Sequence, residues 1–235
     1  MSGGELPLGR PVDWRPVERP GRSPLLGSHV LLRPVEPEGD AEPLYAASHP
    51  PDGDRSVWTY LWDGPYESPE HLREMLEFAE RSEDPLFFSV VRLPEERPEG
   101  IASLMRIEPH HGVIEVGHIW FGVELQRTTA ATEAIYLLAR RAFDELGYRR
   151  LEWKCNALNA ASRRAAERFG FTFEGIFRDH MVVKGRNRDT AWYAITADEW
   201  PPIRAAFEAW LAPGNFDADG RQRRGLGALM AESRA

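Results

Sequence analysis

The sequence of 235 residues lacks several features that mark whole classes of proteins. It holds one cysteine, Cys155, so no internal disulfide can form. A cytoplasmic location is therefore expected, because small secreted domains usually depend on disulfides. No apolar run approaches the ~18 residues of a membrane helix. The first residues, 1–5, lack the basic-then-apolar pattern of a signal peptide.

The chain also lacks an excess of positive charge. Lysine and arginine together number 29 against 37 acidic residues, which gives a formal net charge of −8. With no helix that clusters Lys and Arg, nucleic acid is excluded as the main partner, and a cationic acceptor is mildly favoured. His110-His111 has no partner at metal-ligand spacing, so no metal is expected.

Composition divides the chain into three parts. Residues 1–27 carry five prolines, which predicts an extended arm, neither helical nor part of a sheet, that lies along the domain or a neighbouring subunit. Residues 28–212 form the predicted domain. Residues 213–235 turn to Gly, Asp and Arg, which predicts a flexible tail.

Within the domain, hydrophobic patterning predicts alternating strands and helices. We expect strands over 30–34, 86–92, 101–108, 113–121, 150–155, 171–177 and 190–195. Helices are expected over 38–48, 68–81, 129–146, 160–169 and 196–210. Residues 184–189 are expected to form a solvated hairpin loop. The order indicates an α/β (α+β) architecture with helices layered on a sheet.

The segment 125–134 (LQRTTAATEA) joins the expected strand 113–121 to the long helix. Small residues at a strand-to-helix turn leave backbone N–H groups free to face an anion such as a pyrophosphate. A second helix opens at Asn159-Ala160-Ala161-Ser162 and can carry polar groups to the same ligand. Together these features indicate a cofactor-dependent transferase.

Three local patterns resemble the GNAT superfamily of acyl-CoA-dependent N-acyltransferases, in its RimJ/RimL-like branch. The segment 125–134 is similar to that branch's Q-x-x-G-x-A-T-E-A coenzyme A loop, 159–171 to its N-x-x-S-x-x-x-A-x-x-x-G-F signature, and 115–120 to E-I-G-Y-W. The resemblance covers roughly residues 29–211. It implies a central mixed, mostly antiparallel sheet with a splayed parallel strand pair, 113–121 and 150–155, and helices on both faces.

The sequence departs from the family pattern at two places. Thr129 stands where the loop usually has its first glycine, so its side chain narrows the approach to the backbone. Some relatives carry a carboxylate just after the G-F strand, where this chain has Arg178-Asp179-His180-Met181. Asp179 can serve as a base only if the strand register allows it.

The resemblance implies a set of residues for acetyl-CoA. Strand amides would bind the pantetheine and polarise the thioester, loop amides would hold the pyrophosphate, and Asn159 would hydrogen-bond the pantetheine arm. Asn159 is also a favoured helix cap in its own right. The implied set is Trp120, Phe121, Gly122, Val123, Gln126, Arg127, Thr128, Thr129, Ala130, Ala131, Thr132, Asn159 and Ser162.

Attack of an amine on a thioester needs a neutral amine, a stabilised oxyanion and a protonated leaving thiolate. Ser162 is the candidate acid, and Glu115 and His118 are the candidate bases. On a regular strand these two bases, three residues apart, face opposite sides, so only one points into the cleft unless the strand is bulged. Alternatives without a catalytic role remain for both residues. Glu115 can simply pair with a neighbouring strand, and His118 can be a packed residue.

An aromatic-rich segment lies between two expected helices. Trp58, Tyr60 and Trp62 are interpreted either as core packing or as a wall of the acceptor pocket. Cys155, at the end of an apolar strand, is expected to be buried and inert.

We therefore expect an acyl-CoA-dependent N-acyltransferase that moves an acetyl group directly to a primary amine, either a protein N-terminus or a small amine. A succinyl-CoA enzyme and a non-catalytic acyl-CoA-binding or assembly module are the alternatives. The resemblance and the apolar arm also indicate a homodimer or small homo-oligomer.

Overall fold

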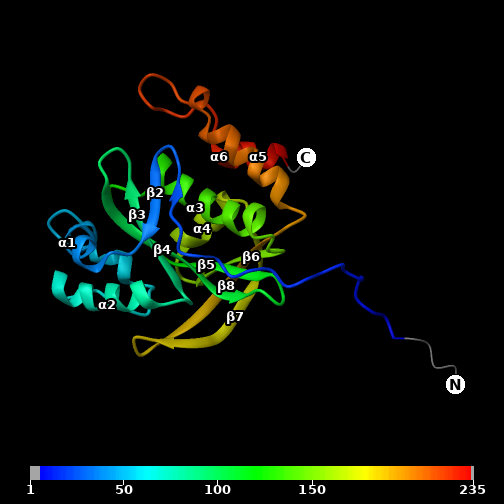
Figure 1. The fold of residues 1–235 in the computed structure, drawn as a ribbon, viewed down its shortest axis with the longest axis horizontal. Helices are drawn as coiled ribbons and strands as arrows, with labels where there is room; N and C mark the ends of the chain where they lie inside the picture. Colours follow the sequence, from blue (N-terminus) through cyan, green and yellow to red (C-terminus); the bar gives the residue numbers. More distant parts are fainter. Residues whose placement is uncertain (1–5, 234–235) are drawn as a thin grey trace.

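The computed structural model describes residues 6–233 and is built on an eight-stranded sheet (Figure 1). The spatial order is β1-β2-β3-β4-β5-β6-β8-β7, and every neighbouring pair is antiparallel except β5 and β6. The strands are β1 (Leu25–Leu26), β2 (Val30–Pro34), β3 (Leu86–Arg92), β4 (Arg97–Glu108), β5 (Val113–Phe121), β6 (Arg150–Asn156), β7 (Thr172–Val183) and β8 (Arg186–Thr196). This confirms the mixed, mostly antiparallel sheet with one parallel pair.

Helices cover both faces of the sheet (Figure 1). Helices α1 (Pro37–Ser48) and α2 (Pro69–Arg81), with the short helical turn η1 (Arg55–Trp58), pack on one face around a cluster that includes Leu44, Leu72, Phe87 and Ile101. The larger core lies on the other face, under α3 (Thr129–Arg140), the π-helical turn η2 (Arg141–Glu145), α4 (Ala160–Arg168), α5 (Trp200–Leu211), the turn η3 (Pro213–Asn215) and α6 (Leu226–Ser233).

Alternation along the strands explains the two cores. Phe88 of β3 faces the core under α3, whereas its neighbour Phe87 faces α1 and α2. Successive side chains of a strand point to opposite faces, so a central sheet with two apolar faces needs a helical layer on each.

Strands β5 and β6 separate soon after they pair. Their parallel register covers only Val113↔Arg150, Ile114↔Leu151 and Glu115↔Glu152, although β5 continues to Phe121 and β6 to Asn156. This is the splayed pair that the resemblance implied. The gap leaves backbone amides and carbonyls without a neighbouring strand, and such groups need another partner.

The N-terminal arm lies along its own domain. Trp14 Nε1 donates to His110 O at 2.7 Å, and the Val17 amide donates to Pro109 O at 3.2 Å. The expectation that the arm forms no sheet is wrong at its end, because Leu25–Leu26 is strand β1, antiparallel to β2. Residues 1–5 lie outside the described part.

The segment after Pro213 is folded, so the expectation of a flexible tail is wrong over 213–233. Asn215 holds it: its Nδ2 donates to Trp210 O and Arg224 O, and its Oδ1 accepts from the Arg224 amide. Helix α6 then buries Leu226, Leu229 and Met230 against the larger core. Residues 234–235 lie outside the described part.

The β7–β8 hairpin is longer than expected. Its turn is reduced to Lys184-Gly185. Residues 186–189, expected as part of the hairpin loop, are strand, and so are residues 178–183, for which no element was expected. The sequence hides this because β7 is mostly exposed and bulged between Phe177 and Met181. Over residues 6–233, no helix has the length and apolar character needed to cross a membrane.

Candidate active site

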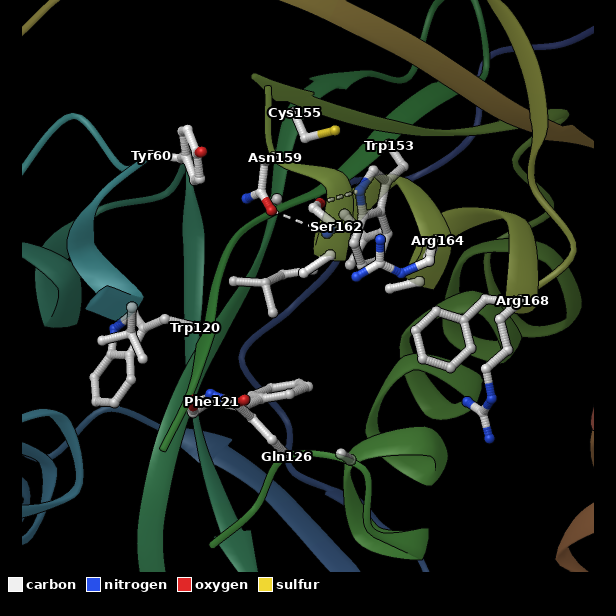
Figure 2. Close-up of a pocket in the computed structure, with 18 of the residues that line it drawn as sticks. Tyr60, Trp120, Phe121, Gln126, Trp153, Cys155, Asn159, Ser162, Arg164 and Arg168 are labelled. Atoms are coloured by element: carbon white, nitrogen blue, oxygen red, sulfur yellow. Dashed lines mark hydrogen bonds between the residues drawn. The ribbon is translucent and has the colours of Figure 1, made fainter. Parts of the chain in front are cut away.

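A cavity of about 1190 Å³ runs along the gap between β5 and β6. It reaches from the start of α3, past the start of α4, to η1 and the first residues of β8. Figure 2 shows Trp120 and Phe121 on one side and Asn159, Ser162, Arg164 and Arg168 on the other. Sites for drug-sized ligands occupy roughly 300–1,000 Å³, so this cavity suits a long ligand with a second molecule beside it.

The start of α3 presents backbone donors to one end of the cavity. Thr128 caps the helix, since its Oγ1 accepts from the Ala131 amide at 3.1 Å. Arg127 adopts a left-handed conformation, with φ of 63°. Within residues 6–233 the amides of Arg127 and Thr129 make no hydrogen bond, and both residues line the cavity. Free amides at a helix N-terminus with a left-handed residue form a site for an anion.

Gln126 fixes this loop to the end of β5. Its Nε2 donates to Phe121 O at 2.8 Å, so the side chain orients the loop (Figure 2). The implied cofactor residues Trp120, Phe121, Gln126, Arg127, Thr128, Thr129, Ala131 and Thr132 line the cavity, whereas Gly122, Val123 and Ala130 do not.

Helix α4 supplies the opposite wall. Asn159 is its cap, because its Oδ1 accepts from the Ser162 amide at 3.0 Å. Ser162 Oγ accepts from Trp153 Nε1 at 3.0 Å, which fixes the hydroxyl at the cavity wall (Figure 2). Both residues line the cavity.

A bulge brings both candidate bases to one face of β5. The β4–β5 register passes from Ser103↔Gly117 to Ile101↔Trp120, so His118 and Ile119 oppose a single residue, and His118 has a φ of 44°. Glu115 and His118 therefore both line the cavity, in contrast to the regular strand that places them on opposite sides.

Glu115 lies in a buried ion-pair network. Its Oε2 is 2.8 Å from Lys154 Nζ and 3.1 Å from Arg106 Nε, and Lys154 Nζ is also 2.5 Å from Glu152 Oε2. The side chains of Glu115 and Lys154 are each 5% exposed. Burial raises the pKa of Glu115 against the opposing effect of Lys154 and Arg106. A carboxylate with a raised pKa in a cavity is suited to general-base work.

His118 is more deeply enclosed. Its ring lies 5.0 Å from that of Trp62 and 5.1 Å from that of Phe87, and its Nε2 is 3.5 Å from Asp63 Oδ2. Neither ring nitrogen has a hydrogen-bond partner within residues 6–233. Burial lowers the pKa of His118, which keeps the ring neutral near pH 7.

The aromatic segment divides between wall and core. Tyr60 and Trp62 line the cavity, and Tyr60 Oη donates to Leu158 O at 3.3 Å. Trp58 does not line the cavity; it is fully buried, 4.9 Å from the ring of Trp120. The interpretation of Trp58 as part of the acceptor pocket is therefore wrong, and its role is core packing.

Cys155 also lines the cavity, and burial raises the pKa of its thiol, so it is a poor nucleophile there. Asp179 is exposed and does not line the cavity, so it is not placed as a base. Within residues 6–233, no group of three or more His, Cys, Asp or Glu side chains could hold a metal ion.

The structure adds residues that the motifs did not include. Arg164 and Arg168 lie four apart on α4 and line the cavity, a spacing that could have identified them (Figure 2). Arg188 enters from β8, and Trp210, Phe216, Gly220 and Gln222 from the C-terminal segment. Gln222 begins the stretch 222–227 (QRRGLG), whose letters fit a Q-x-x-G loop pattern although no strand precedes it. No signal in the sequence placed Gln222 beside α4.

The chain is similar to known proteins in both sequence and fold. Residues 29–172 match the family described as "Acetyltransferase (GNAT) domain". A GCN5-related N-acetyltransferase from Brucella melitensis has a structure with a TM-score of 0.89 and 44% identity, covering 93% of this chain and 99% of that one. A GNAT-family structure from Chromobacterium violaceum gives a TM-score of 0.75 at 36% identity, over 84% of this chain and 99% of its own.

A curated relative in Bacillus subtilis is named "Putative ribosomal N-acetyltransferase YdaF". It is 32% identical over 101 residues, which are 43% of this chain and 55% of the relative. The aligned part thus spans little more than half the length of that relative.

Proposed function

This chain belongs to the GNAT family of acetyltransferases, and from that premise we propose that it moves an acetyl group from acetyl-CoA directly to a primary amine. One observation carries the proposal. A single cavity joins the free amides at the start of α3 to the buried carboxylate of Glu115 through the gap between two splayed strands. The cavity therefore leads from the proposed anion site, through the gap between the strands, to the proposed base.

The residues present fit coenzyme A. The free amides of Arg127 and Thr129 suit a pyrophosphate, and both residues line the cavity. Arg168 adds a cation: its Nη1 donates to Thr132 Oγ1 at 3.2 Å, and it has no carboxylate partner within residues 6–233. When bound, acetyl-CoA supplies the acetyl group as an activated thioester.

The side chains then divide the proton work. Glu115, whose pKa burial raises, accepts a proton from the acceptor ammonium or from the attacking amine. Ser162 Oγ, fixed by Trp153 Nε1, donates a proton to the leaving sulfur. Tyr60 and Trp62 enclose the acceptor end and reduce access of water.

The acceptor class, the cellular location and the oligomeric state are proposals. The acceptor is proposed to be a protein N-terminus or a small amine, and the word "ribosomal" in the name of the YdaF relative favours a protein acceptor. A cytoplasmic location and a homodimer or small homo-oligomer remain predictions from the sequence; sedimentation at high concentration tests the second.

Calorimetric titration of acetyl-CoA into wild type and Thr129→Trp tests the cofactor site. We expect micromolar binding by wild type and loss of binding in the variant, because the indole would fill the space beside the free amides. Val182→Trp is the matched control, since Val182 is 79% exposed and does not line the cavity. Equal binding by all three proteins would contradict the assignment.

A second assay separates an enzyme from a binding module. Thiol release is followed over a panel of amines, with acetyl-CoA and succinyl-CoA as donors. Tight cofactor binding without thiol release for any amine would favour a non-catalytic module. Release only with succinyl-CoA would favour a succinyltransferase.

A further inference from the structure

The charge of the cavity is opposite to that of the chain. The whole sequence has a formal net charge of −8, yet the cavity lining holds five Lys or Arg side chains and one carboxylate, that of Glu115. The five are Arg127, Lys154, Arg164, Arg168 and Arg188. The local field therefore favours an anionic ligand, whatever the average surface suggests.

Four of these cations already have a role. Arg127, Arg164 and Arg168 lie on α4 or at the start of α3, where the cofactor phosphates are proposed to bind. Lys154 is paired with Glu115 and Glu152. Arg188 is left over, and within residues 6–233 its guanidinium has no hydrogen bond and no ion pair.

Arg188 lies at the acceptor end of the cavity. It lies near the start of β8 and is opposed by Met181 of β7. Two residues further along β8, Thr190 pairs with Asn156 at the end of β6. Electrostatic coupling reaches it from Glu115, Cys155 and Arg106, which places its charge near the candidate base. The hairpin that carries it is joined to η1 by Lys184 Nζ, which donates to Trp58 O at 2.7 Å.

An unpaired, half-buried guanidinium is costly to keep. Its Nε is buried with no partner, and burial lowers the pKa of Arg188. Its neighbour Asp189 does not compensate it, because Asp189 Oδ1 accepts from the Asp179 amide and from Asn187 Nδ2. Arginine presents a planar fork of donors that matches a carboxylate or phosphate.

We propose that Arg188 binds an oxyanion of the acceptor, so that the preferred acceptor is an amine carrying a carboxylate or phosphate a few bonds from the reacting nitrogen. This inference rests on the proposed function, because it takes Glu115 as the end of the cavity where the amine reacts. It makes Arg188 a specificity-determining residue for the acceptor. The acidic balance of the whole chain, which mildly favoured a cationic acceptor, is overridden by the charge inside the cavity.

Matched acceptors isolate the charge. The peptide amides Ser-Glu-Ala-Ala and Ser-Gln-Ala-Ala share the same terminal amine and differ by one side-chain charge. Glycine with glycinamide, and O-phosphoethanolamine with ethanolamine, test a free carboxylate and a phosphate. Comparing the anionic-to-neutral ratio of kcat/KM between wild type and Arg188→Gln cancels the difference in amine basicity within each pair.

In at least one pair, wild type should prefer the anionic member by about tenfold to a hundredfold, the size expected for a charged hydrogen bond. Arg188→Gln should abolish this preference by raising KM for the anionic acceptor. Because the lost charge also lies near Glu115, any change in kcat should be the same for both members of a pair. Arg186→Gln, an exposed arginine two residues away that does not line the cavity, is the control and should behave as wild type.

Two results would overturn the inference. One is an anionic preference that is unchanged in Arg188→Gln, whether or not kcat falls equally for both members of a pair. The other is no anionic preference in wild type.

If no amine releases thiol, the proposed function has failed and binding decides the inference. Acetyl-Ser-Glu-Ala-Ala and acetyl-Ser-Gln-Ala-Ala, and the corresponding N-acetyl forms of the small amines, are then titrated into the coenzyme A-loaded protein. Tighter binding of an anionic member to wild type, lost in Arg188→Gln, would support the oxyanion site. Equal binding within every pair would overturn it.

Discussion

Replacing Lys154 by methionine should move the acid limb of the pH profile of kcat/KM upward by about one to two pH units. Lys154 Nζ lies 2.8 Å from Glu115 Oε2, and both side chains are 5% exposed. At this separation, unit charges interact by roughly 6 kcal/mol at an effective dielectric constant of about 20. This energy equals about 4 pKa units and is an upper bound. Arg106, 3.1 Å from the same oxygen, stays in place, and water that replaces the ammonium recovers much of the lost interaction, so one to two units are expected.

The direction follows from the role of Glu115 as a base. The base works when ionised, so the rate rises with pH through its pKa. Removing a nearby cation destabilises the carboxylate. The pKa of Glu115, which burial already raises, should therefore rise further. Each unit of pKa corresponds to about 1.4 kcal/mol.

The assay is thiol release as a function of pH, with circular dichroism and cofactor titration to show that the variant is folded. This check is needed because breaking a buried ion pair costs about 3–5 kcal/mol of stability. Glu152→Gln is the control of sign: the negative charge of Glu152 raises the pKa of Glu115, so removing it should move the acid limb downward. An active Lys154→Met enzyme with an unmoved limb would refute Glu115 as the base and leave His118.

Three further outcomes can be measured. Ser162→Ala should lower kcat by about a hundredfold, if its hydroxyl protonates the leaving thiolate, with the calorimetric affinity for acetyl-CoA unchanged. Asp40→Asn should lower the free energy of unfolding by about 3–5 kcal/mol in chemical denaturation, because the fully buried Asp40 binds Arg33 through both oxygens and accepts from Ser89 Oγ. Leu226→Ala should lower it by about 2–5 kcal/mol, since Leu226 is 1% exposed; a mobile tail would show no effect.

The sequence was sufficient for the family and for most of the sheet. Motifs that combine a strand, a loop and a helix start depend on neighbouring residues, so 125–134 and 159–171 indicated the parallel pair and both helix starts, and the comparisons confirm the GNAT resemblance. Helix α2 was recognised because Ser68 and Pro69 mark its start, and Ser68 Oγ does accept from the His71 amide.

The features that the sequence did not predict depend on contacts between residues far apart in the chain. The bulge at His118 is a property of the β4–β5 register, and no local pattern in 113–121 reports it. Trp58 looked the same as Tyr60 and Trp62 in sequence, and only packing against Trp120 and Tyr66 separates it as core. Arg188 lies outside every motif and reaches the cavity through the hairpin.

The C-terminal error had a different origin. Gly, Asp and Arg dominate residues 214–225, and their polarity concealed Leu226, Leu229 and Met230, whose three- and four-residue spacing is the pattern of an amphipathic helix. Asn215, which holds the segment through three hydrogen bonds, reads in the sequence as an ordinary loop residue.

The position of this segment has a consequence for the order of folding. The cavity is lined from Ser56 to Gln222, and Trp210 Nε1 donates to Gln222 Oε1 at its outer end. Bringing Ser56 and Gln222 to one cavity is slow, because the long stretch of chain between them must first be closed into a loop. During synthesis the sheet and α3 can assemble before residues 210–222 leave the ribosome. The cavity therefore gains its outer wall last, and a folding intermediate would carry the anion-binding loop while its groove is still open to solvent.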